Sequence, residues 1–242
     1  MQILLLSDIH GNLQALQAVL EKVKRDYQIG GCVLLGDLID YGMHSNEVIG
    51  ILKNLTYPVL CNIWGNHEHA VYHDAYGRFS SERGKCSARH TKKILTQESW
   101  EYIRGEMKKE GTFSFECGRK RCLAVHGSLE DEYWISIKPE NRLEEYREFD
   151  YVFSGHSHIP HFVEKFYGSD KSGTRNKKKV IFINPGSAGQ PRNLNNMAQF
   201  AVFETQEEKV VFDKAAYDIE KEQESFTGEV DPFYRDRLEK GI

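Results

Sequence analysis

Short apolar runs recur along the chain, and each of them ends at a polar residue. The runs are ILLL (3–6), CVLL (32–35), VLCNIW (59–64), CLAV (122–125) and YVF (151–153). The polar side chains that follow them include Asp8, Asp37, Asn66, His126 and His156. Apolar runs of this kind, bounded by glycine and polar residues, are typical of buried β-strands.

Two amphipathic stripes with helical spacing separate the first three runs. The first stripe follows Asn12 and consists of Leu13, Leu16, Val19, Leu20 and Val23. The second follows Ser45 and consists of Val48, Ile49, Leu52 and Leu55. Asn12 and Ser45 are candidate N-caps, because their short polar side chains can accept a hydrogen bond from the first helical turn. The order β-α-β-α-β predicts an α/β fold with a parallel sheet flanked by helices.

The spacing of three polar residues supports this prediction. Asp8, Asp37 and Asn66 follow one another at intervals of 29 residues. A βαβ unit takes about 30 residues, so equivalent positions fall at the C-terminal ends of neighbouring strands. Open α/β sheets bind their ligands at that edge.

The rest of the chain is less regular, although the whole of 1–242 fits one domain. Residues 68–111 are polar and partly helical in pattern, and we expect a helical insertion over the site, a candidate lid. FSFEC-GRKR-CLAV predicts a hairpin, and the later runs HFVEKFY, VIFINPG, AQFAVFE and KVVFDKAAY predict a mostly antiparallel group of strands. Residues 169–179 form a basic loop, and residues 219–242 a charged C-terminal tail.

Composition narrows the class of protein. Apolar residues make up 40% and charged residues 28% of the 242 residues, which is usual for a soluble domain. A net charge of −4 argues against a general nucleic-acid or membrane binder. The N-terminal apolar run is too short for a signal peptide or a membrane span. Five irregularly spaced cysteines suit a reducing, cytoplasmic setting.

Seven side chains at the predicted strand ends carry the chemistry. They are Asp8, His10, Asp37, Asn66, His126, His156 and His158. This mixture of carboxylate, imidazole and amide suits divalent manganese, iron, zinc or nickel, with manganese the first choice. Seven donors exceed the needs of one tetrahedral ion. They match two ions that share a carboxylate, the arrangement of two-metal hydrolases.

Taken together and in order, the motifs resemble those of the calcineurin-like metallophosphoesterase superfamily. The matching pieces are Asp8-Ile-His10, Gly36-Asp37, Gly65-Asn66-His67-Glu68, His126-Gly127 and Gly155-His156-Ser157-His158. The similarity covers nearly the whole chain. The segments GDLIDYG, VHGS and INPGSAGQPR resemble the small prokaryotic branch of this superfamily. That branch is related to bacterial Ser/Thr phosphatases, diadenosine-tetraphosphatases and simple phosphodiesterases. The resemblance implies a two-sheet αββα sandwich and a metal-dependent hydrolase of small or nucleotide-like phosphoesters.

The resemblance also implies individual roles. One ion would be held by Asp8, His10, Asp37 and His158, and the other by Asp37, Asn66, His126 and His156. A hydroxide bridging the two ions would attack the phosphorus. His67 would be the general acid that protonates the leaving oxygen, and Asp40 would orient its ring.

One position departs from the family pattern. Many relatives have a basic residue before Gly-Asn-His, where this chain has Trp64. The loss of that phosphate contact speaks against the alternative of a Ser/Thr-type protein phosphatase. Arg192 and His69 are candidate substitutes for binding substrate. A second alternative, a non-catalytic scaffold of the same fold, is disfavoured because His67 and every ligand position are present. Four other histidines, His44, His73, His90 and His161, are expected at the surface.

Overall fold

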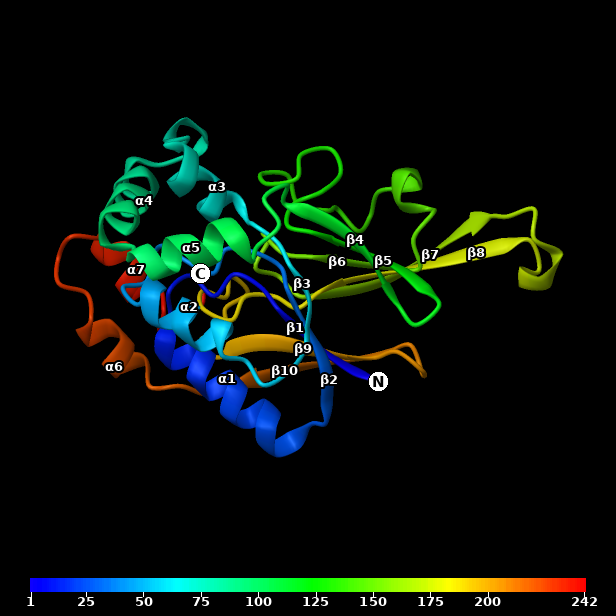
Figure 1. Cartoon of the computed structure of the whole chain (residues 1–242), viewed down its shortest axis with the longest axis horizontal. Helices are drawn as coiled ribbons and strands as arrows, with labels where there is room; N and C mark the ends of the chain where they lie inside the picture. Colours follow the sequence, from blue (N-terminus) through cyan, green and yellow to red (C-terminus); the bar gives the residue numbers. More distant parts are fainter.

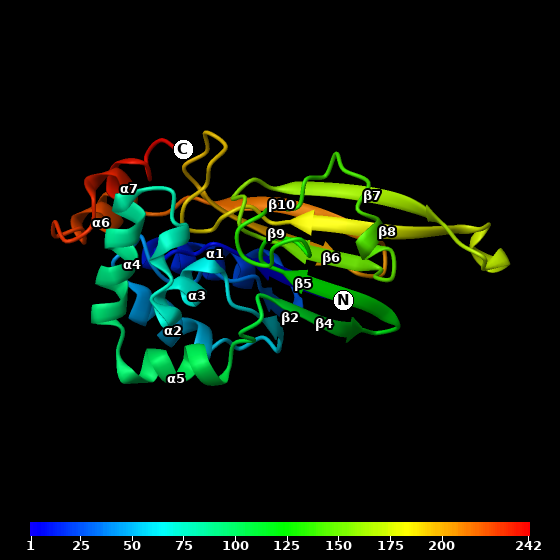
Figure 2. The same ribbon diagram turned by 90° about the horizontal axis from the view of Figure 1, so that it is seen from above.

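The computed structural model describes residues 1–242, with the side chain of Thr174 left aside. Two five-stranded sheets pack face to face, and most helices gather at one end of the sandwich (Figures 1 and 2). The first sheet has the order β10 (Lys209–Ala215), β9 (Ala198–Glu204), β1 (Gln2–Leu6), β2 (Ile29–Leu34), β3 (Val59–Asn62). The second has the order β4 (Thr112–Cys117), β5 (Lys120–Val125), β6 (Tyr151–Ser154), β8 (Lys177–Asn184), β7 (His161–Gly168).

The β-α-β-α-β start predicted from the sequence is confirmed. Strands β1, β2 and β3 are parallel neighbours, joined by α1 (Leu13–Asp26) and α2 (Ser45–Lys53). Asn12 caps α1 by accepting a hydrogen bond from the main-chain N–H of Ala15. The predicted cap at Ser45 is wrong, because His44 precedes the helix and Ser45 begins it. The Ser45 hydroxyl instead accepts a hydrogen bond from the main-chain N–H of Asp40.

The side chains of strand β1 alternate between two hydrophobic cores. Ile3 and Leu5 lie in the core between the two sheets, whereas Leu4 and Leu6 lie in the core between the first sheet and its helices. Successive side chains of a strand point to opposite faces, so a continuous apolar run is needed where both faces are covered. Each of these four side chains is fully buried and contributes about 1.5–3 kcal/mol of hydrophobic free energy.

The second sheet is mixed as well. Strands β4 and β5 form the predicted hairpin, and β5, β6 and β8 run parallel. The last four strands pair antiparallel as predicted, but they do not form one group, because β7 pairs with β8 in the second sheet and β10 pairs with β9 in the first. Segment 185–197 crosses between the sheets, which a run of strand-like segments does not reveal. The outer face of the second sheet packs against residues of 137–149, among them the short helix η2 (Glu144–Tyr146).

The remaining helices lie at the end of the sandwich where β1, β2 and β3 finish (Figure 1). They are α3 (Asn66–His73), η1 (Tyr76–Arg78), α4 (Glu82–Ile94), α5 (Gln97–Gly105), α6 (Ile219–Glu224) and α7 (Pro232–Asp236); a further short turn, η3 (Ser172–Thr174), lies between β7 and β8. Residues 219–242, expected as a tail, fold back onto the domain, where α6 packs against α1 and α7 lies beside α4. None of the helices in the described part of the chain has the length and hydrophobicity that a membrane crossing requires.

Candidate metal centre

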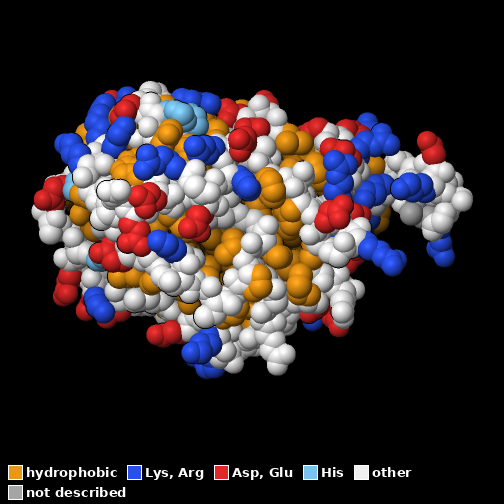
Figure 3. Space-filling model, in the orientation of Figure 1, with side chains coloured by type: hydrophobic (Ala, Val, Ile, Leu, Met, Phe, Trp, Pro, Cys, Tyr) orange, Lys and Arg blue, Asp and Glu red, His pale blue; other side chains and the backbone are white. Residues whose placement is uncertain are grey.

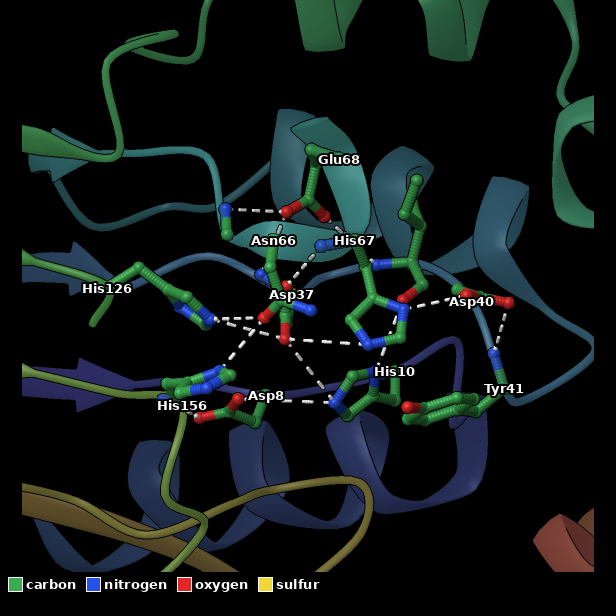
Figure 4. A network of polar contacts seen from close by, with 12 residues as sticks. Asp8, His10, Asp37, Asp40, Tyr41, Asn66, His67, Glu68, His126 and His156 are labelled. Atoms are coloured by element: carbon green, nitrogen blue, oxygen red, sulfur yellow. Dashed lines mark hydrogen bonds and ion pairs between the residues drawn. The ribbon is translucent and has the colours of Figure 1, made fainter. Parts of the chain in front are cut away.

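The structure brings all seven predicted side chains together where β1, β2, β3, β5 and β6 end. Figure 4 labels Asp8, His10, Asp37, Asn66, His126 and His156 among them. Asp8, His10, Asp37 and His158 form one group, whose candidate ligand atoms lie within 4.8 Å of one another. His158 Nε2 is 3.2 Å from Asp8 Oδ1 and 3.2 Å from His10 Nε2. Four donors from three loops therefore converge on one small volume.

A second group shares Asp37 with the first. It contains Asp37, His126 and His156, again with ligand atoms within 4.8 Å. Asn66 joins it, because its Oδ1 lies 3.0 Å from His126 Nε2 and 2.9 Å from His156 Nδ1. Only the Asp37 carboxylate belongs to both groups. The centre is thus built from both sheets, with His126 and His156 supplied by the second.

Two buried oxygens test whether metal ions fit. Asp8 Oδ1 and Asp37 Oδ2 are inaccessible to solvent and have no hydrogen-bond partner among the described residues. A buried carboxylate oxygen without a partner costs free energy unless a cation compensates it. Each of these oxygens faces histidine nitrogens, Asp8 Oδ1 toward His158 and Asp37 Oδ2 toward His126 at 3.3 Å. The donor set therefore fits two divalent ions.

The histidine rings are held by their second nitrogen. His126 Nδ1 lies 2.7 Å from the main-chain oxygen of Leu35, and His158 Nδ1 lies 2.6 Å from that of Gln190. A carbonyl oxygen only accepts, so Nδ1 carries the proton and Nε2 is left as the ligand atom. This pattern of support is usual for metal-binding histidines.

The electrostatics of the group are those of a cation site. Burial opposes ionisation of Asp37, but the charges of His126 and His67 hold the pKa of that carboxyl well below its usual range. Burial lowers the pKa of His156 to about 4, so its imidazole is neutral, the form that binds metal. Burial also lowers the pKa of His126, but Asp37 outweighs it and raises that pKa to about 9. His126 would therefore release a proton when an ion binds.

The main chain at this centre is strained. Asp8, His10, Asp37, His156 and His158 all have positive φ, between 49° and 62°. Such left-handed conformations are uncommon for residues other than glycine and concentrate at functional sites. Strand β1 ends at Leu6, so Asp8 and His10 reach the centre from the turn that follows the strand.

Glu68 supports the centre without belonging to either group, a role the sequence did not indicate. Its buried carboxylate accepts hydrogen bonds from the main-chain N–H groups of Asp37, Leu38 and Gly65, at 2.8–2.9 Å. It thereby ties the turn after β2 to the start of α3. The Gly-Asn-His-Glu order, with an acid at the third helical position, is the only sequence signal for this contact.

His67 lies beside the two groups and is held by Asp40, as expected. Its Nδ1 is 2.6 Å from Asp40 Oδ2, and its Nε2 is 3.9 Å from Asp37 Oδ2. Asp40 Oδ1 accepts hydrogen bonds from the hydroxyls of Ser87 and Thr91 on α4. Helix α4 therefore helps to position the His67 ring.

A cavity of about 560 Å³ opens over the centre and includes Asp37, His67, His156 and His158 in its lining. Arg192 lines it too, and its buried Nε has no partner among the described residues. His69 does not line this cavity; its ring lies against Tyr133, with ring centroids 4.5 Å apart and the planes tilted by 35°. Trp64 is fully buried, and its Nε1 donates a hydrogen bond to the main-chain oxygen of Ile103.

The other histidines are less exposed than expected. His44 is half-buried and lies 3.2 Å from the buried carboxylate of Glu222. His161 is half-buried, and burial lowers its pKa to about 4. His90 is also half-buried, so of the four only His73 is exposed. The C-terminal segment, unsuspected as a packing partner, covers His44.

A family model and a related protein each match most of the chain. A family model described as the calcineurin-like phosphoesterase superfamily domain matches residues 1–208. The protein MJ0912 of Methanocaldococcus jannaschii is 30% identical over 227 residues, which cover 92% of this chain and 90% of that protein.

Two solved structures are similar over the whole chain. A metallophosphoesterase from Sphaerobacter thermophilus has a TM-score of 0.74 at 25% identity and covers 100% of both chains. The protein PH1004 from Pyrococcus horikoshii OT3 has a TM-score of 0.84 at 21% identity, and the match covers 100% of this chain and 98% of that one. The second likeness shows the fold alone.

Proposed function

The chain belongs to the calcineurin-like phosphoesterase superfamily, and from this we propose that it is a two-metal hydrolase of small or nucleotide-like phosphoesters. The observation that carries the proposal is the position of Asp37. Its carboxylate is the one shared by the two ligand groups, and its Oδ2 is buried without a partner among the described residues. A shared carboxylate is the feature that distinguishes a two-ion site from two unrelated clusters.

The proposed ligands follow the two groups. Asp8, His10, Asp37 and His158 would hold one ion, and Asp37, Asn66, His126 and His156 the other. Manganese is the first choice for this donor set, with iron, zinc or nickel as alternatives. When bound, the ions would supply a water-derived nucleophile at neutral pH and neutralise charge on the phosphoryl oxygens.

Side chains around the centre would donate the proton and bind the phosphoryl group. Asp40 fixes the His67 ring through Nδ1, so Nε2 is turned toward Asp37 and the cavity. In that position Nε2 would give a proton to the leaving oxygen, a contribution typically worth 10²–10⁴-fold in rate. Arg192 lines the same cavity with an unused donor and would bind the phosphoryl group.

The test is a substrate comparison on the manganese-loaded protein. We expect hydrolysis of bis-p-nitrophenyl phosphate that is lost on chelation and restored by manganese. A phosphoserine peptide serves as the competing substrate. Turnover of the peptide alone would overturn the assignment in favour of a protein phosphatase, and no turnover of any phosphoester would overturn the enzymatic proposal.

A further inference from the structure

The C-terminal segment builds the outer wall of the cavity. Phe233, Tyr234 and Arg237 line it, and all three lie beyond residues 1–208 that the family model matches. Tyr234 is buried and stacks on Tyr41 with ring centroids 4.1 Å apart. Tyr41 in turn lies 4.4 Å from the His67 ring. The wall is therefore anchored to the floor of the site.

Four arginines from different parts of the chain line the cavity, and three of them have no acidic partner among the described residues. Arg83, Arg192 and Arg237 all line the cavity, and none has an Asp or Glu ion-pair partner among the described residues. Arg78, also in the lining, differs because it pairs with Asp131 at 2.6 Å. Unpaired guanidinium groups that face one cavity repel each other, so their convergence indicates an anionic ligand.

The three arginines form a row that leads away from the metal centre. Arg192 is the inner one, close enough for its charge to lower the pKa of His158, after burial. Arg237 is next; burial, then the charge of Arg192, lowers its pKa to about 10. Arg83 is the outer one, and its guanidinium lies 3.9 Å from the Phe233 ring, which Arg237 also approaches at 5.1 Å.

Among the three arginines, Arg237 gives the strongest indication of an anionic ligand. It is only 7% exposed, although arginine is seldom buried without a counter-charge. Its Nε donates to the main-chain oxygen of Ile242, which fixes the side chain and leaves the other guanidinium nitrogens available. A buried guanidinium that is held at Nε by the backbone, with no Asp or Glu ion pair among the described residues, keeps its terminal nitrogens for a phosphate, which guanidinium binds in bidentate fashion.

We propose that Arg83 and Arg237, with Arg192 as their inner neighbour, form a subsite for a second phosphate next to the scissile one. The substrate would then carry at least two phosphate groups, as nucleoside polyphosphates do. This proposal rests on the proposed function, because it takes the metal centre as the place of the scissile phosphate. The C-terminal segment would thus determine specificity without taking part in the chemical step.

Binding measured by calorimetry tests the subsite without requiring turnover. The probes are inorganic tripolyphosphate and orthophosphate, titrated into the manganese-loaded full chain, with heats of metal chelation subtracted by blank titrations. The variants are Arg237→Gln and Arg83→Gln. Arg235→Gln is the matched control, because Arg235 is in the same segment, pairs with Asp236 and does not line the cavity.

We expect tripolyphosphate to bind the wild type at least about tenfold more tightly than orthophosphate. Each variant should lose about tenfold of the tripolyphosphate affinity, the usual effect of one charge-assisted contact, and keep orthophosphate affinity within about twofold. Arg83 is exposed, so its variant keeps the test valid if Arg237→Gln fails to fold.

Equal losses for both probes, or no loss for either, would overturn the subsite. The two proposals fail separately. A protein that hydrolyses no phosphoester but shows the tripolyphosphate preference retains the subsite and loses the enzymatic function. A protein that hydrolyses bis-p-nitrophenyl phosphate but binds both probes equally retains the enzymatic function and loses the subsite.

Discussion

Replacement of Gly65 by alanine should disable the metal centre through one contact. A Cβ at this position would lie 2.1 Å from Asp37 Oδ1. Gly65 has φ −98° and ψ −174°, which alanine adopts freely, so the main chain itself does not oppose the change. The Cβ would also lie 2.5 Å from the main-chain nitrogen of Asp37, so both the shared carboxylate and the turn that carries it must move.

The size of the displacement follows from the contact. An ordinary van der Waals contact to Cβ begins at 3.4 Å, so the carboxylate must move by about 1.3 Å (3.4 − 2.1 Å). Glu68 and the His67 main-chain N–H, which donates to Asp37 Oδ1 at 2.9 Å, hold the carboxylate and its turn in place. A displacement of about 1 Å at a catalytic group can cost 10²-fold in rate. Gly65→Ala should therefore lose at least about 100-fold in kcat and bind metal more weakly.

The assay is metal-dependent hydrolysis of bis-p-nitrophenyl phosphate, with metal content determined on the same samples. Gly50→Ala is the control, because a Cβ there meets nothing within 4 Å and alanine favours helix α2. We expect the control to retain wild-type activity. Wild-type activity and metal content in Gly65→Ala would refute the close packing of Gly65 on Asp37.

Three further results are expected. His67→Ala should slow a dinucleotide, whose leaving alkoxide needs a proton, about 10²–10⁴-fold, and should slow p-nitrophenyl esters far less; an equal loss for both would remove His67 as the acid. Asp40→Asn should lower kcat about 10–100-fold, because its amide would face His67 Nδ1 as a donor, and an unchanged pH–rate profile would contradict this. Burial lowers the pKa of His161 in the folded protein to about 4, below the unfolded value of about 6.5, so neutral His161 contributes its full stability to the fold above about pH 6.5. This contribution is lost as the pH falls toward 4. Urea unfolding of the wild type against His161→Gln should show a loss of up to about 3 kcal/mol between pH 7.5 and 4, and parallel curves would exclude the effect.

The first half of the site was predictable from periodicity. Asp8, Asp37 and Asn66 recur at 29 residues, and parallel βαβ units place equivalent positions side by side. The contributions of His126 and His156 could be named from their motifs, but not their origin in a second sheet. Sheet assignment depends on long-range pairing, which local patterns do not encode.

Other features could not be read from the sequence for physical reasons. The positive φ of Asp8 and Asp37 is imposed by surrounding contacts, not by residue type. Trp64 occupies a motif position where relatives carry a basic residue, yet it is buried against α3 and α5 and does not line the cavity. Charge in residues 219–242 suggested a solvated tail, because the sequence does not show that Tyr234 stacks on Tyr41 and that Phe233 packs against Arg83.

The number of bound metal ions tests the central claim most directly. Metal analysis by mass spectrometry on the manganese-loaded chain and on Asp37→Asn compares a centre with and without the shared carboxylate. We predict two ions per chain in the wild type and no more than one in the variant. One ion in the wild type, or two retained in Asp37→Asn, would contradict a two-metal site that Asp37 holds together.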